Sequence, residues 1–132
     1  MRRFLLDTHI WLWGALEPHK LTSEVHQILA DPESVRCLSP ISLWELAVLV
    51  EKKRISLKED YAKWVERSVN DLELNEVPLQ WKVVYEMSFI LPNHRDPADR
   101  FLAATAIAYD LILVTADQKL MSVPGLKVLA NV

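Results

Sequence analysis

The sequence predicts an α/β fold in which short, mostly parallel strands alternate with helices. Short apolar runs bounded by turn residues alternate along the chain with segments whose apolar residues recur every three or four positions. Residues 111–115 are apolar almost without interruption, as is typical of a parallel strand buried on both faces. With 132 residues, 51% of them apolar, the chain has the size of one domain, and we expect a single domain over residues 1–132.

Five short apolar segments are predicted as strands because a turn residue ends most of them. The predicted strands are residues 3–7, 35–38, 74–77, 111–115 and 127–129, the last of them at an edge of the sheet. Pro78 ends the third strand, and Asp7 closes the first. Ligands of such parallel sheets bind beyond the carboxyl ends of the strands, so we expect a functional site there.

Helical spacing of apolar residues predicts the segments between the strands as helices. They are residues 8–16, about 23–30, about 39–50, 58–72, 79–91 and 97–109, with a short helix from residue 117. Thr22 or Ser23 can cap the second helix, and Ser42 and Glu45 have the spacing of a capping box in the third. Asp96 followed by Pro97 is a strong start signal for the helix at 97–109.

Two further expectations concern side chains on the helices. In the helix at 79–91 the inward positions are predicted to be Val83, Val84, Met87 and Ile90, and residues 92–95 are predicted as a loop. Trp11 and Trp13 lie two positions apart on one helix, so both cannot point into the same core. We expect one of the two to lie at the surface, where it could line a groove for a partner.

Composition excludes several classes of function. The net charge of −3 argues against a protein that coats nucleic acid, although a nuclease with an acidic metal site remains compatible with it. The four histidines show no metal-ligand spacing, Cys37 is the single cysteine, and no glycine-rich phosphate loop or nucleophile elbow is present. No stretch approaches the roughly 18 apolar residues that span a bilayer, and we expect a cytoplasmic protein.

Four acidic residues hold comparable positions although they lie far apart in sequence. Asp7 and Asp117 each follow a predicted strand, and Glu45 and Asp99 fall in the opening turns of two apolar helices. If the strands are parallel, these acids share one edge of the sheet. Clustered carboxylates repel one another by about 1 kcal/mol per pair at 4 Å in water and roughly 4 kcal/mol near a protein surface unless a cation joins them. A metal site is therefore the first hypothesis.

Each acid also has a structural explanation. Asp7 could cap the helix that follows it, a role that Thr8 could share, and the capping box would explain Glu45 fully. Asp96 is most simply an N-cap, which makes Asp99, three residues later, the better ligand.

Asp117 could also cap a helix, with Thr115 placed to hydrogen-bond a ligand or water at the strand end. A single shared site explains the four positions more simply than four separate caps do. Four carboxylates suit one or two Mg²⁺ or Mn²⁺ ions, and two such ions about 4 Å apart support phosphodiester hydrolysis.

Four segments together resemble the PIN-domain family and, more narrowly, the VapC toxins of toxin–antitoxin pairs. These segments are residues 5–9 (LLDTH), 39–46 (SPISLWEL), 94–106 (HRDPADRFLAATA) and 113–117 (LVTAD). The resemblance covers essentially the whole chain, in order and in length. It implies a PIN-like three-layer α/β/α sandwich with a central, mostly parallel sheet of four to five short strands.

The resemblance also implies a function for the acids. In that family the residues matching Asp7, Glu45, Asp99 and Asp117 form the metal site of a ribonuclease that depends on Mg²⁺ or Mn²⁺. Supporting positions match Thr115, Thr8, Asp96 and Arg100, the last two belonging to a sub-pattern. The implied partners are an RNA substrate, a second copy of the chain and a small VapB-like antitoxin, with no membrane.

Other functions stay open at this point. A housekeeping PIN nuclease without an antitoxin and a catalytically silent PIN-fold binding module would carry the same fold. A dehalogenase-type phosphatase would need a second Asp two residues after Asp7, where the chain has His9, and a receiver domain would need an adjacent acidic pair before its acceptor strand.

Overall fold

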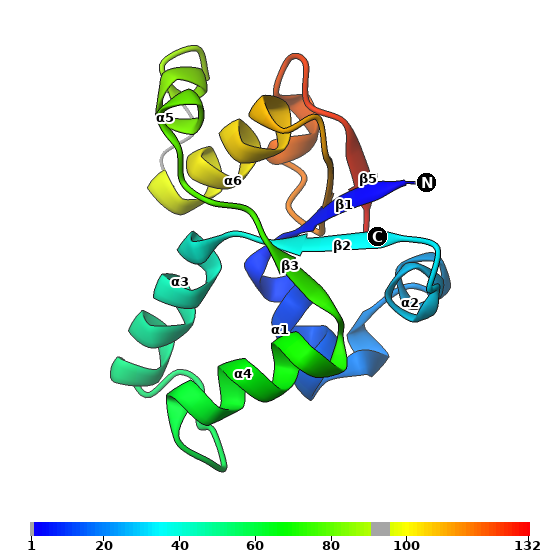
Figure 1. Ribbon diagram of the computed structural model, residues 1–132, viewed down its shortest axis with the longest axis vertical. Coiled ribbons are helices and arrows are strands. Elements are labelled where there is room, and N and C mark those ends of the chain that lie inside the picture. The colour runs from blue at the N-terminus through cyan, green and yellow to red at the C-terminus, as the bar shows by residue number, and fades with distance from the viewer. Residues whose placement is uncertain (1, 91–95) are drawn as a thin grey trace.

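A five-stranded parallel sheet with the order β3-β2-β1-β4-β5 forms the centre of the computed structural model, which describes residues 2–90 and 96–132 (Figure 1). The strands are β1 (Arg3–Leu6), β2 (Val35–Leu38), β3 (Leu74–Glu76), β4 (Ile112–Thr115) and β5 (Val128–Ala130). Every neighbouring pair is parallel, with Leu5 opposite both Cys37 and Leu113. The predicted α/β class and the edge position of the last strand are confirmed.

Helices cover both faces of this sheet. They are α1 (Thr8–Leu16), α2 (Ser23–Ala30), α3 (Pro40–Glu51), α4 (Tyr61–Asp71), α5 (Trp81–Met87) and α6 (Pro97–Ala108), with the short 3-10 helices η1 (Pro18–Lys20) and η2 (Leu120–Ser122). Because side chains alternate along β1, Phe4 and Leu6 pack with α1 to α4, and Leu5 packs with α5 and α6. Cys37 is buried and free in the second of these cores, as expected of a small core residue.

Three sequence predictions about the helices are wrong in detail. The third helix is capped by Ser39, whose hydroxyl accepts a hydrogen bond from Ile41 N (3.1 Å), so Ser42 and Glu45 do not form a capping box. The last short helix starts at Leu120 and not at residue 117. Val84, predicted to point inward, is 57% exposed.

Other boundaries differ less. The helix predicted at 58–72 is α4, which begins at Tyr61, and the one predicted at 79–91 is α5, which ends at Met87. The predicted loop at 92–95 and the last residue of the helix predicted at 79–91 lie outside the described residues. No helix in the described part of the chain has the length and apolar character needed to cross a membrane.

The two neighbouring tryptophans have different surroundings. Trp11 is fully buried, stacks at a tilt on Trp64 with ring centroids 5.4 Å apart, and donates a hydrogen bond to Ser68 Oγ (3.2 Å). Trp13 is only partly buried and lies beside the ammonium group of Lys20. Trp13 is thus the more exposed of the two, but it packs against the same core as Trp11, so the predicted split between core and surface is only partial.

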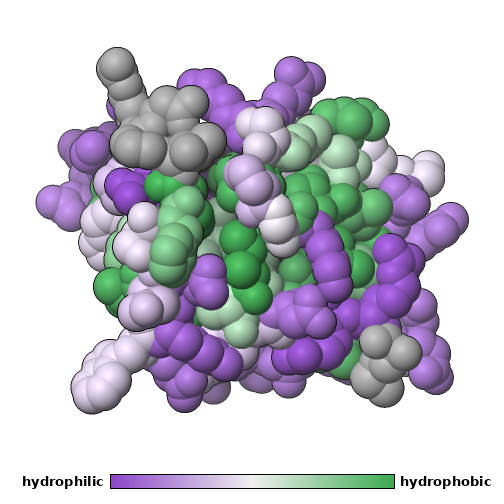
Figure 2. Space-filling view, turned by 90° about the horizontal axis from the view of Figure 1, so that it is seen from above, coloured by the Kyte–Doolittle hydropathy of each residue, from purple (hydrophilic) through white to green (hydrophobic). Residues whose placement is uncertain are grey.

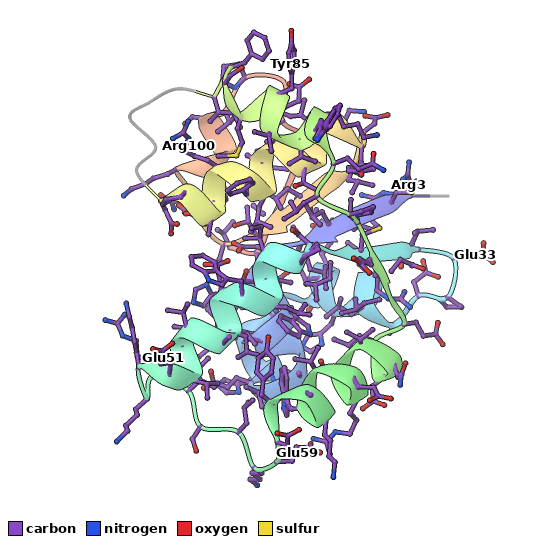
Figure 3. All side chains as sticks on the ribbon, turned by 60° about the vertical axis from the view of Figure 1, so that its left-hand side comes forward. Arg3, Glu33, Glu51, Glu59, Tyr85 and Arg100 are labelled. Atoms are coloured by element: carbon purple, nitrogen blue, oxygen red, sulfur yellow. The ribbon has the colours of Figure 1, made fainter. Side chains whose placement is uncertain are left out.

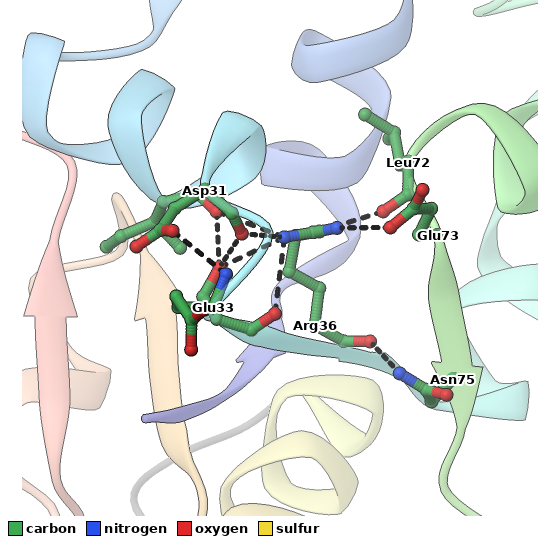
Figure 4. A network of polar contacts seen from close by, with 8 residues as sticks. Asp31, Glu33, Arg36, Leu72, Glu73 and Asn75 are labelled. Carbon is green, nitrogen blue, oxygen red and sulfur yellow. Dashed lines mark hydrogen bonds and ion pairs between the residues drawn. The ribbon is translucent and has the colours of Figure 1, made fainter. Parts of the chain in front are cut away.

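A buried arginine stabilises the end of the sheet where β2 begins. Arg36 is 4% exposed, and its guanidinium donates to the carbonyl oxygens of Leu72 (2.8 Å) and Asp31 (2.7 Å) (Figure 4). An ion pair with the exposed Glu73 (3.4 Å) completes the network. A buried cation is costly unless several acceptors surround it. The acceptors of Arg36 come from the turn before β2 and the turn after α4, so its contacts hold these two turns together.

Candidate active site

Asp7 is the best-defined member of the site. It lies directly after β1 and is 6% exposed, and its Oδ2 accepts a hydrogen bond from Thr115 Oγ1 (2.6 Å) at the end of β4. Asp7 occupies the N-cap position of α1, but its side chain makes no capping hydrogen bond. The carboxylate is therefore directed to the strand end and not used as a helix cap.

Glu45 is held by the first turn of α1. The hydroxyl of Thr8 donates to Glu45 Oε1, and it also lies 2.8 Å from Ser42 Oγ. Since α3 begins at Pro40, Glu45 lies in its second turn, and no capping role explains the position of its carboxylate. Thr8 and Ser42 are both buried, so Glu45 rests on a fixed polar support.

Asp99 and Asp117 complete the group from the other side. Asp99 lies in the first turn of α6, whose N-cap is Asp96, with Asp96 Oδ1 accepting from Ala98 N (3.0 Å) as predicted. Asp117 follows β4 and accepts from Lys119 N (2.9 Å), while its own amide donates to Thr115 Oγ1 (3.0 Å). The carboxyl groups of Asp99 and Asp117 are joined by a hydrogen bond.

Mutual electrostatic effects show that these side chains share one site. Burial raises the pKa of Asp99, and the charges of Asp96, Asp7 and Asp117 raise it further, to about 8. Burial also raises the pKa of Glu45, against the hydrogen bond from Thr8, and Asp7 and Asp96 add to the increase. The ends of β1 and β4 and the first turns of α3 and α6 therefore bring their acids close enough for their charges to interact, as the parallel arrangement predicted. Figure 3 shows the side chains of these elements on the ribbon.

The side chain of His9 lies near these acids. Burial raises the pKa of Asp7, while the hydrogen bond from Thr115 and the charge of His9 lower it, and the charge of His9 also lowers the pKa of Glu45. His9 is exposed on α1 and its ring lies 5.9 Å from that of Trp13. Sequence reasoning missed His9, because its single signal was adjacency to Asp7 and Thr8.

Ser42 was also misjudged from the sequence. It is fully buried beneath Glu45 and hydrogen-bonds Thr8, where a capping role was expected. Its position three residues before Glu45, on the same helical face, was the signal for this supporting role. Arg100 Nη2 donates to Met87 O (3.5 Å), which ties α6 to α5.

The acids fit a hard divalent cation by their chemistry. Over residues 2–90 and 96–132, no three His, Cys, Asp or Glu side chains form a ready-made metal cage. Instead Asp7 is bonded to Thr115, Glu45 to Thr8, and Asp99 to Asp117. All candidate ligand atoms are carboxylate oxygens. Burial raises the pKa of Asp99, and the charges of the neighbouring acids raise it further, so a cation bound among them would favour the ionised carboxylates.

A parallel α/β/α sandwich with acids gathered at the carboxyl ends of its strands belongs to the class of domains that can hold a metal ion at that edge. The model of the PIN domain family matches residues 4–126, and the chain belongs to this family.

Within the family, the chain is 31% identical to ribonuclease VapC22 of Mycobacterium tuberculosis over 123 residues, 92% of each chain.

Solved structures agree with the fold. The chain matches VapBC2 from Rickettsia felis, bound to a DNA fragment from their promoter, with a TM-score of 0.76, 20% identity and coverage of 97% of this chain and 98% of that one. It matches the DNA-bound VapBC from Salmonella typhimurium with a TM-score of 0.73 and 20% identity over the full length of both chains. The predicted three-layer sandwich is thereby confirmed.

Proposed function

We propose that the protein is a metal-dependent endoribonuclease, the toxin of a VapBC-type toxin–antitoxin pair, acting in the cytoplasm. The observation that carries the proposal is the convergence of carboxylates from four elements on one sheet edge, in a chain 31% identical to a ribonuclease. RNA is the proposed substrate, a small VapB-like antitoxin the proposed inhibitor, and a homodimer the proposed assembly.

The proposed ligands for one or two Mg²⁺ or Mn²⁺ ions are Asp7, Glu45, Asp99 and Asp117. When bound there, such ions would supply the positive charge that activates water and stabilises phosphate oxygens. The protein itself holds the acids in place through hydrogen bonds. Thr115 bonds Asp7 and the amide of Asp117, and Thr8 bonds Glu45. These buried hydroxyls orient the carboxylates as outer-shell partners do in other metal sites.

Asp99 would act as the proton-holding member of the group. With a pKa of about 8, its carboxyl keeps a proton at neutral pH and shares it with Asp117. Ion binding must displace this proton, so we expect protons to be released when the site is loaded.

Cleavage of RNA by purified variants tests the assignment. We expect Asp7→Asn and Asp117→Asn each to lower the cleavage rate by roughly 100-fold or more in millimolar MnCl₂, because each removes a negatively charged ligand. The matched control is Asp110→Asn, which removes an exposed acid paired with Lys127 and should leave the rate unchanged.

Full activity in either site variant would refute the assignment of these residues. A cleavage rate that EDTA leaves unchanged would refute the metal requirement. A neighbouring reading frame for a small DNA-binding protein would separate the toxin from a housekeeping nuclease of the same fold.

A further inference from the structure

The loop that follows α3 concentrates basic side chains. Segment 52–58 contains Lys52, Lys53, Arg54 and Lys58 and no acidic residue, so it carries four positive charges in a chain whose net charge is −3. All four residues are exposed, and no ion pair between residues that the structure describes neutralises them. We call segment 52–58 the basic loop.

The backbone of the basic loop is a fixed part of the fold. Ile55 and Leu57 pack against the core that α1 to α4 share, so the loop turns its apolar side chains inward and leaves its cations exposed. Arg54 N donates a hydrogen bond to Leu49 O (2.9 Å), and Lys53 has a left-handed φ of 58°, which turns the chain out of α3. The cations are therefore carried by an anchored loop and not by a free tail.

Stabilisation of the end of α3 explains only part of this charge. Lys52 is the C-cap of α3, and Lys53 and Arg54 follow it directly, so these three residues can offset the partial negative charge of the helix end. The effect of a helix dipole fades within its last turn. Lys58 lies seven residues after the last residue of α3, so the helix end does not account for the basic loop as a whole.

Helix α3 links the basic loop to the acids of the candidate active site. Glu45 lies in its second turn, and Lys52 follows seven positions later. Because seven residues make almost two turns, Lys52 lies on the helical face that carries Glu45, about 10 Å further along the axis. Figure 3 shows the loop between Glu51 and Glu59 at the outer margin of the molecule, beyond the end of α3.

The side of the molecule formed by α5 and α6 has a different character. Seen from this side, apolar residues gather across the middle of the molecule (Figure 2). Lys82 and Glu86 cancel each other in the segment 79–90, and the ammonium group of Lys82 lies over the ring of Tyr109 (3.8 Å). A polyanion is therefore attracted more strongly by the basic loop than by α5.

We propose that the basic loop binds phosphates of the RNA on one side of the bond that is cleaved. This binding rests on the proposed function, in which RNA is the substrate. The clustered acids repel a phosphate chain, so the cations at the other end of α3 supply the attraction that the acids lack. An acidic protein segment would also complement this charge, but the helix shared with Glu45 favours the strand that enters the active site.

The affinity for RNA at several salt concentrations tests this binding. Fluorescence anisotropy of a labelled single-stranded RNA is measured in MgCl₂ with Asp7→Asn in every protein, so that cleavage does not interfere. For the double variant Lys52→Gln, Arg54→Gln we expect Kd to rise roughly 10-fold at about 50 mM salt. The slope of log Kd against log salt should fall by about 1.4, because each lost contact to a single strand removes about 0.7.

The matched control is the double variant Arg2→Gln, Lys127→Gln. It removes the same charge from two exposed residues that precede β1 and β5, at the ends where the strands begin, and should leave Kd and the salt slope unchanged. Without Asp7→Asn, the basic-loop variant should raise KM for RNA cleavage and keep kcat and the cut sites, since phosphate contacts carry no sequence information. Thermal melting should show both variants folded, because the substituted residues are exposed.

Two outcomes would overturn the proposed RNA contact: an unchanged Kd and salt slope in the basic-loop variant, or an equal change in the control. The first outcome would leave an acidic protein segment as the partner of the basic loop. Because binding is measured without cleavage, a protein that binds RNA through this loop but cleaves none would refute the proposed function and not the RNA contact.

Discussion

Thr115 connects the two acids that follow strands β1 and β4. Its hydroxyl donates to Asp7 and accepts from the amide of Asp117, so one buried oxygen positions both of these proposed ligands. The sequence predicted that Asp7 and Asp117 share one edge, because strand ends of a parallel sheet meet there. It predicted Thr115 as a partner of a ligand or water, whereas its hydroxyl bonds Asp7 and the amide of Asp117. It could not predict the position of His9 near the acids, which depends on how α1 packs.

Replacement of this hydroxyl should damage the site and the fold together. We expect Thr115→Val to lower the free energy of unfolding by about 1–3 kcal/mol, because the buried Asp7 carboxylate loses its donor. RNA cleavage should fall by roughly 10- to 100-fold, as for other outer-shell partners of metal ligands. Thermal melting and a cleavage assay at a temperature well below melting measure the two effects.

Thr105→Val is the control for this prediction. Thr105 is as buried as Thr115, but its hydroxyl donates to Phe101 O within α6 (2.7 Å). The Thr105→Val variant should lose stability while keeping the cleavage rate of the unchanged chain. Equal losses of cleavage in both variants would show that Thr115 acts only through stability.

At the scale of the element, the start of α3 decides how Glu45 is used. The sequence contained both signals, Ser39 before Pro40 and the capping-box pair Ser42 and Glu45. Proline at the first helical position fixes the start one turn earlier, and Ser39 then satisfies the amide of Ile41. Because α3 starts earlier, Glu45 is not needed as a cap, and its carboxylate accepts a hydrogen bond from Thr8.

The cap of α3 can be tested separately from the site. We expect Ser39→Ala to cost about 1 kcal/mol, because an N-cap acceptor is lost, and to lower the melting temperature by about 4 °C. Ser122→Ala, which alters an exposed serine, should change the melting temperature little. An unchanged melting temperature in Ser39→Ala would contradict the observed cap.

Helix α5 shows why periodicity alone misplaced Val84. Apolar residues lie on both sides of this helix, so the three- and four-residue spacing is met by Val83 and Met87 and equally by Trp81 and Tyr85. Only packing against α6 decides which side is buried, and Val84 falls on the other one. When apolar residues lie on two sides of a helix, the sequence alone does not specify which of the two sides faces inward.

At the scale of the whole molecule, the buried arginine and the acids lie at opposite ends of the strands. Arg36 fastens turns at the end where the strands begin, while the acids gather where the strands end. The acid cluster opposes folding at neutral pH, because burial and like charges disfavour the ionised form of Asp99.

The pH dependence of stability follows from the raised pKa of Asp99. Its pKa is about 8 in the folded protein and near its ordinary value of 3.8 in the unfolded chain, so the folded state binds the extra proton between these values. The contribution of Asp99 to the free energy of unfolding is therefore most favourable below about pH 4, where the carboxyl is protonated in both states. It is lost as the pH rises through 8. In EDTA, we expect the melting temperature of Asp99→Asn to rise relative to the unchanged chain across this window.

Thermal melting in EDTA from pH 5 to 9 measures this trend. Asp110→Asn is the control, since its exposed carboxyl has a pKa lowered by Lys127 and ionises below the window. Millimolar Mn²⁺ should stabilise the unchanged chain most at high pH, where no proton competes. A constant difference between Asp99→Asn and the unchanged chain across the window would contradict the raised pKa.

The bond between Thr115 and Asp7 joins residues 108 positions apart. Because β1 lies between β2 and β4, it can complete its pairing only after β4 has emerged from the ribosome. Asp117 is made later still. We therefore expect a nascent chain to stay inert until β4 and Asp117 have both been made and β4 has paired with β1.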